Sequence, residues 1–157
     1  SDFNLVSHRP NIKFFEGVAG IKKVYEDTLA SGENIHAFVS PDEPHPDLYN
    51  WLTTDYVRKR IRKDIKAFVV VADGEKTDLY KKSDAAELRQ ARVVPKELYP
   101  LATEIALYAG RKVALISYRG DELIAIVIES PAIYATFKSM FDMAWDYSAN
   151  ICTNKSK

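Results

Sequence analysis

The sequence predicts an α/β domain in three layers, with helices on both faces of a mixed sheet. Two observations favour this class. In the first part of the chain, strand-like segments alternate with helix-like segments, and strands linked by helices are mostly parallel. In the second part, three strand-like segments follow one another across short glycine-bearing turns, which is typical of an antiparallel meander, and an amphipathic helix comes after them.

The N-terminal segments predict strand, helix and strand. NIKFFEG (11–17) is a strand, since aromatic residues precede a glycine that ends it. A helix opens at Gly20 and ends at Gly32, because apolar residues recur between them at helical spacing. IHAFV (35–39) is a second strand, and the proline-rich, acidic stretch 40–47 is a loop. The apolar stripe of the helix comprises Ile21, Val24, Tyr25 and Leu29.

The middle of the chain continues the alternation. Residues 47–64 can place their apolar side chains on one broad helical face. KAFVVVAD (66–73) is a nearly continuous apolar run, which suits a strand covered on both faces. The polar stretch 75–89 is a helix or a helical loop, and ARVVP (91–95) is a short strand.

The meander and the last helix follow. EIALYAG, RKVALISYR and ELIAIVIES lie within 104–130 and are joined at Ala109-Gly110 and Gly120-Asp121. Ser130-Pro131 predicts an N-cap followed by proline at the first helical position. The helix carries one apolar stripe and is expected to fray after Tyr147. The stripe comprises Ile133, Phe137, Met140, Phe141, Ala144 and Trp145.

Composition limits the function classes. The 157 residues suit one domain, and Lys+Arg 22 against Asp+Glu 22 gives no excess positive charge for a dedicated nucleic-acid surface. Cys152 is the only cysteine, which excludes an intramolecular disulfide and favours a reducing, cytoplasmic setting. No apolar stretch is long enough to span a membrane. The basic run RKRIRKDIK (58–66) is interpreted first as a solvated helix face, and second as a contact for an anion or an acidic partner.

Motifs for cofactors and catalysis are absent from the sequence. There is no GxxxxGK[ST] or GxGxxG motif, so Gly17 and Gly20 favour a turn and a helix start over a phosphate cradle. The three histidines, His8, His36 and His45, are too scattered for a metal site, and no GxSxG elbow presents a nucleophile. We therefore predict no cofactor, no metal and no catalytic residue.

Polar residues at strand ends are the candidate ligand-binding residues. In α/β sheets such groups converge on a crevice, the usual ligand site. Each of them taken alone is typical of a surface or capping residue. The candidates are Glu16, Ser40, Asp73, Glu104, Ser117 and Glu129.

The ordered motifs resemble one family. HRPNIKFFEGVAGIKKVYEDTL, YVRKRIRKDIKAFVVV, RVVPKELYPLATEIALYAGRKVALISYRGDELIAIVIES and the closing MAWDYS occur in this order. Together they resemble the C-terminal sensor domain of TrmB-like transcriptional regulators of archaea and bacteria. The resemblance covers 8–148, leaving 1–7 as an edge or linker and 149–157 as a polar tail.

The resemblance implies a phospholipase-D-like fold preceded, in a longer protein, by a winged-helix DNA-binding domain that this chain lacks. It also implies a small-molecule effector, a sugar in the best-known members, and a homodimer. Enzymes of that fold use H-x-K-x4-D, but no lysine stands two residues after any histidine here. The resemblance therefore implies a non-catalytic sensor.

Two alternatives stay open at this point. The first is a hydrolase that uses two of Glu16, Glu104 and Glu129 as an acid–base pair, which requires them to meet in one cleft. The second is a protein-interaction module without a ligand, in which the apolar final helix forms a subunit interface.

Overall fold

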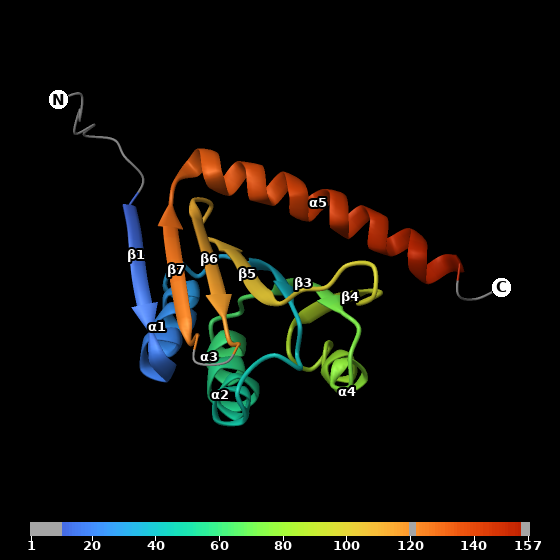
Figure 1. Cartoon of the computed structure of the whole chain (residues 1–157), viewed down its shortest axis with the longest axis horizontal. Helices are drawn as coiled ribbons and strands as arrows, with labels where there is room; N and C mark the ends of the chain where they lie inside the picture. Colours follow the sequence, from blue (N-terminus) through green and yellow to red (C-terminus); the bar gives the residue numbers. More distant parts are fainter. Residues whose placement is uncertain (1–10, 120–121, 155–157) are drawn as a thin grey trace.

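The computed structural model describes residues 11–119 and 122–154, which form one seven-stranded sheet between two layers of helices (Figure 1). The strand order is β1-β7-β6-β5-β2-β3-β4. Strands β2, β3 and β4 are parallel to one another, and every other neighbouring pair is antiparallel. The mixed sheet with a C-terminal meander is thus confirmed. The strands are β1 (Asn11–Glu16), β2 (Ile35–Val39), β3 (Ala67–Ala72), β4 (Arg89–Val94), β5 (Thr103–Tyr108), β6 (Lys112–Ser117) and β7 (Ile124–Glu129).

Helices cover both faces of the sheet. The long helix α5 (Pro131–Asn154) crosses one face alone, and the shorter helices lie on the other (Figure 1). This is the predicted three-layer arrangement. The shorter helices are α1 (Gly17–Ala30), α2 (Pro46–Trp51), the π-helical turn η1 (Leu52–Tyr56), α3 (Val57–Arg62) and α4 (Thr77–Lys82).

Strand β3 shows how the sheet divides the core. Its side chains alternate between the faces, so Val69 and Val71 join the cluster under the shorter helices. Val70 lies between them and packs in the second cluster, against α5. All three valines are almost fully buried, which explains why this segment has the nearly continuous apolar sequence of a strand covered on both faces.

The boundaries of four elements differ from the predictions. Helix α1 begins at Gly17 rather than Gly20, because Gly17 adopts a φ of +72° and turns the chain directly out of β1. The helix expected over 47–64 is interrupted by the π-helical turn η1. The polar stretch 75–89 contains only the six residues of α4 as helix, and β4 begins at Arg89 rather than 91.

The start of α5 is as predicted, and its end is not. The Ile133 amide donates a hydrogen bond to Ser130 Oγ at 3.3 Å, and Pro131 occupies the first helical position. The helix continues to Asn154 instead of fraying after Tyr147, since neither glycine nor proline stops it.

The apolar stripe of α5 packs against its own sheet, where buried Phe141 contacts Phe38 and Trp145. The stripe is therefore core and is not free to form a subunit interface. Met140 is the exception, since it is 50% exposed. The expected turn at Gly120-Asp121, the segment 1–7, His8 and residues 155–157 lie outside the described residues.

Candidate functional site

A cavity of about 350 Å³ lies between the sheet and the shorter helices. Its floor is apolar, because small and β-branched side chains of β2, β3 and β5 point toward these helices. Its walls come from α1, the α2–η1–α3 segment and α4. The floor comprises Ile35, Ala37, Val39, Ala67, Val69 and Ala106.

Glu104 on β5 faces this cavity together with two tyrosines, Tyr25 and Tyr118. The Tyr25 hydroxyl from α1 donates a hydrogen bond to Glu104 Oε2, and the Tyr118 hydroxyl lies 3.1 Å from the same oxygen. The two hydroxyls also contact each other. The three oxygens form a compact cluster, which we call the Glu104 cluster.

The environment of the Glu104 cluster favours the neutral acid. Burial raises the pKa of Glu104 to about 7, although the hydrogen bonds from Tyr25 and Tyr118 act in the opposite direction. Burial also raises the pKa of both tyrosines well above their usual value, and the negative charge of Glu104 adds to this. Glu104 thus changes its charge near neutral pH while its two partners stay neutral.

Aromatic rings continue the wall beside the Glu104 cluster. Tyr56 packs edge-on against Tyr25, with ring centroids 5.1 Å apart, and its hydroxyl lies 2.7 Å from Thr28 Oγ1. Burial raises the pKa of both Tyr56 and Tyr80, so both remain neutral. With Tyr49 from α2, five tyrosines line the cavity.

Arg60 of α3 closes the cavity at the opposite end and is only 2% exposed. Its guanidinium donates to the carbonyl oxygens of Ile65 at 2.8 Å, Leu88 at 3.2 Å and Glu87. These carbonyls immediately precede or adjoin the starts of β3 and β4. Arg60 therefore connects α3 to the N-terminal ends of β3 and β4.

A second arginine, Arg89, stabilises the wall formed by α4. Its Nε donates to Asp84 at 2.8 Å, and its Nη1 pairs with Glu87. The guanidinium stacks on the Tyr80 ring, with Cζ 3.6 Å from the centroid, and bonds to the Tyr80 carbonyl. The positive charge of Arg89 is thus neutralised within the protein.

The loop after β2 lines the cavity and is held by Asp42. Its carboxylate accepts hydrogen bonds from the amides of Glu75 and Lys76, both at 2.9 Å, at the start of α4. Glu43, next in the loop, pairs with Arg119 at 3.0 Å. Ser40 lines the cavity from the same loop.

We expect Asp42→Ala to lower the free energy of unfolding by about 1–2 kcal/mol, the usual cost of losing a side-chain cap on backbone amides. Urea denaturation followed by circular dichroism measures this change. Asp47→Ala, which removes an exposed carboxylate from α2, is the control and should stay within about 0.5 kcal/mol. Equal stability of Asp42→Ala and the wild type would contradict an anchoring role for Asp42.

Two of the six candidate residues, Ser40 and Glu104, line the cavity together. The others lie elsewhere. Glu16 is exposed at the end of edge strand β1, Asp73 is exposed after β3, and the Ser117 hydroxyl lies 3.3 Å from Glu122 Oε2 at the surface. Glu129 pairs with Arg111 at 2.8 Å. The structure does not bring these four to the cavity.

The three glutamates of the hydrolase alternative do not share a cleft. Glu16 pairs in register with Ile124 and Glu129 with Asn11, so they lie at opposite ends of the β1–β7 pair. Five residues at 3.4 Å separate them by about 17 Å. Phe15 packs in the core on the cavity side, so Glu16 faces the other side of the sheet from Glu104. A carboxylate pair for hydrolysis requires a much shorter separation.

Sequence reasoning did not identify the other members of the site. The apolar stripe of α1 predicts only that Tyr25 is buried, although a tyrosine hydroxyl in such a stripe signals a polar partner. Arg60 belongs to the basic run that was interpreted as a solvated face, and no local signal distinguishes it from its neighbours. The prediction of a solvated face is wrong for Arg60.

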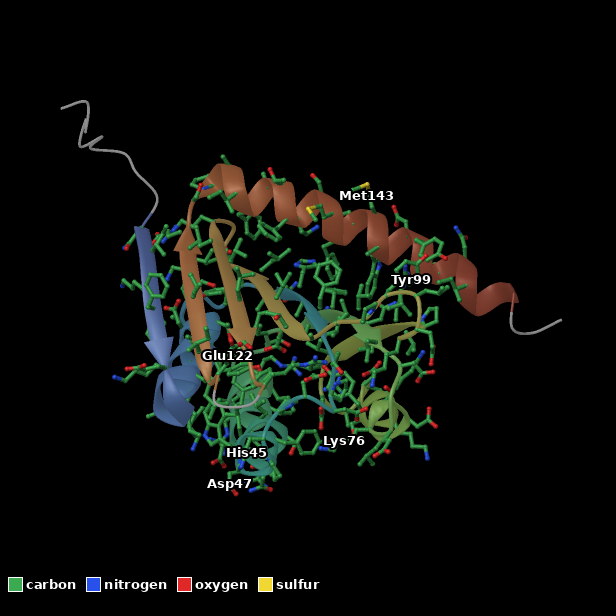
Figure 2. The ribbon with its side chains drawn as sticks, viewed as in Figure 1. His45, Asp47, Lys76, Tyr99, Glu122 and Met143 are labelled. Carbon is green, nitrogen blue, oxygen red and sulfur yellow. The ribbon has the colours of Figure 1, made fainter. Side chains whose placement is uncertain are left out.

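Metal ligands do not cluster in the described part of the chain: no three His, Cys, Asp or Glu side chains lie together in it. His45 is exposed at the start of α2 next to Asp47, and its Nδ1 accepts the Asp47 amide at 3.3 Å. Figure 2 shows both residues at the edge of the molecule opposite Met143 on α5. No helix in the described residues has the length and apolar character to cross a membrane.

Comparison with known proteins gives a likeness of fold. No protein-family model and no curated protein matches the chain. Among solved structures, the fold is similar to that of TrmBL2, an archaeal chromatin protein for which a novel mode of DNA binding is described. The TM-score is 0.56 at 13% sequence identity, over 91% of this chain and 54% of that chain. The chain thus spans about half the length of that structure.

Proposed function

We propose that this chain is the effector-sensing domain of a TrmB-like transcriptional regulator. In this proposal it binds a small molecule, forms a homodimer in the cytoplasm, and acts on DNA through a winged-helix domain of a longer protein. The observation that carries the proposal is the cavity above the sheet, whose apolar floor meets a polar Glu104 cluster. An apolar pocket with a few converging polar groups is the usual form of a ligand site.

Two further observations support a sensor rather than an enzyme. The hydroxyl groups that line the cavity, among them Ser40 and Ser83, have no histidine beside them in that lining. Glu104 has no second carboxyl partner in its hydrogen-bonded cluster, which contains only tyrosines. The likeness of fold to TrmBL2 agrees with the same assignment.

Thermal melts against a panel of compounds test the proposal. The panel is glucose, maltose, AMP, phenethylamine and 3-phenylpropionate, which covers sugars, a nucleotide and small organic ions. A compound at one hundred times its dissociation constant stabilises the native state by about 2.7 kcal/mol. For a domain of this size that corresponds to a rise in melting temperature of about 5–10 °C. No shift with any compound, while a dimer persists, would favour a purely structural role.

The homodimer has its own test, in which Phe14 is the residue to change. Phe14 on edge strand β1 is 77% exposed and lies near exposed Ile12 and Ile124. We expect Phe14→Glu to convert the dimer to a monomer in light scattering, because a charge is placed among apolar side chains.

Met143→Glu is the matched control, since Met143 is 66% exposed on α5 and lies away from edge strand β1 (Figure 2). It should remain dimeric. A monomeric wild type would contradict the homodimer, and dissociation of Met143→Glu alone would place the interface on α5.

A further inference from the structure

We infer that the cavity binds an organic monoamine cation with an apolar body, and that the ammonium group pairs with the Glu104 carboxylate. The inference rests on the proposed sensing function and specifies the chemical class of the effector. It differs from the sugar that the family resemblance implies.

The carboxyl groups that line the cavity, other than that of Glu104, are paired with arginines. Glu43 is paired with Arg119 at 3.0 Å, and Glu87 is paired with Arg89. No ion pair reaches Glu104 in the described part of the chain, where its hydrogen-bond partners are two neutral tyrosines. A cationic ligand would supply the missing counter-charge, and one unpaired carboxyl suits a single ammonium group.

The guanidinium of Arg60 donates to three carbonyl oxygens at the starts of β3 and β4. Arg60 bonds to the carbonyl of Ile65, just before β3, and the first pair of that strand is Ala67 with Ile35. Glu104 precedes Ile105, which pairs with Phe38 near the other end of β2. At 3.3 Å per residue, at least about 10 Å of strand separates the two sites. Arg60 therefore lies toward the other end of the strands from Glu104, and a cation held by Glu104 would not contact it directly.

Aromatic rings form the wall of the cavity next to Glu104. Tyr25, Tyr56 and Tyr118 line the cavity; Tyr25 and Tyr118 touch the carboxyl itself, and Tyr56 packs on Tyr25. The negative faces of aromatic rings attract organic ammonium groups, and more strongly when water is excluded. The remainder of the ligand would lie on alanine and β-branched side chains of the floor. Those side chains suit hydrocarbon and leave the hydroxyls of a sugar without partners.

A proton-linked affinity follows from this geometry. An ammonium ion favours the ionised carboxyl, so binding should strengthen as pH rises past the Glu104 pKa of about 7. Tyr25 and Tyr118, which contact the carboxyl, and the other lining tyrosines Tyr49, Tyr56 and Tyr80 all have raised pKa values and stay neutral over this range. The other charged groups lining the cavity are Glu43, Arg60, Glu87 and Arg89.

Calorimetric titration at pH 5.5 and pH 8 tests the inference. The probes are phenethylamine, its uncharged analogue 2-phenylethanol, the anion 3-phenylpropionate, and maltose. We expect phenethylamine alone to bind well, with an affinity at least about tenfold weaker at pH 5.5, where little Glu104 is ionised. Glu104→Gln should abolish this pH dependence and weaken binding at pH 8. Glu97→Gln, an exposed carboxyl outside the cavity, should behave as the wild type.

The outcomes separate the inference from the proposed function. Binding of maltose or 3-phenylpropionate in place of the amine would overturn the amine inference and leave effector sensing intact. Equal affinity for phenethylamine and 2-phenylethanol, or binding that does not change with pH, would also overturn it. Absence of binding by every compound here and in the thermal panel would overturn effector sensing itself.

Discussion

Arg60→Met is expected to lower the free energy of unfolding by about 3–5 kcal/mol. The substitution keeps most of the side-chain volume and removes the guanidinium, which leaves carbonyl oxygens of Ile65, Glu87 and Leu88 without this donor in a buried setting. Hydrogen bonds from a charged donor are worth about 1.5–3 kcal/mol each, and buried groups that lose a partner are penalised further. Urea denaturation at pH 7, followed by far-ultraviolet circular dichroism, measures the change.

Arg62→Met is the matched control, because Arg62 lies on the same helix and is exposed. It should change stability by no more than about 0.5 kcal/mol. Similar urea midpoints of unfolding for Arg60→Met and the wild type would show that the contacts of Arg60 with the starts of β3 and β4 do not stabilise the fold.

Glu104→Gln is expected to remove a pH dependence of stability. In the native protein the Glu104 pKa is about 7, and in the unfolded chain it returns to the ordinary value of 4.5. Between these pH values the native state binds more protons than the unfolded chain. The contribution of Glu104 to stability is therefore fully present at low pH, falls as pH rises, and levels off above about pH 7. The difference of two and a half pKa units corresponds to about 3 kcal/mol in the free energy of unfolding.

The measurement is chemical denaturation at half-unit steps from pH 4.5 to pH 8. The free energy of unfolding of the wild type should fall between pH 4.5 and pH 8. For Glu104→Gln this fall should be smaller by about 3 kcal/mol, because a neutral amide replaces the acid. Glu97→Gln removes an exposed carboxylate and should keep the slope of the wild type. The contradicting result is a wild-type stability that rises between pH 5 and pH 7 and that Glu104→Gln does not change. That result would mean that burial does not raise the pKa of Glu104.

The fold was predictable because its signals are local. The valine run at 66–73, the glycine-bearing turn at Ala109-Gly110 and the cap at Ser130-Pro131 each correspond to an observed element. The order of the strands was not predictable, because β1 pairs with β7 across almost the whole chain and no local pattern encodes that contact.

The candidate site was predictable only in part. Ser40 and Glu104 follow the rule that polar groups at strand ends converge on a crevice, and both line the cavity. The same rule selected Glu16 and Glu129, which border strands equally well but lie at opposite ends of an edge pair. Arg60 was missed for a different reason: whether one arginine of a basic run is buried depends on how α3 packs on distant strands.

The central claim is that the cavity on the α1–α4 side of the sheet binds a small organic molecule. Methyl NMR spectra tell the two faces apart, because Val69 lines the cavity and its neighbour Val70 packs on the α5 side. The spectra are recorded during titration with whichever compound of the thermal panel raises the melting temperature. We expect shifts at Val69, Ala37 and Ala106, with Val70 and Val113 unchanged. Shifts confined to Val70 and Val113 would contradict it.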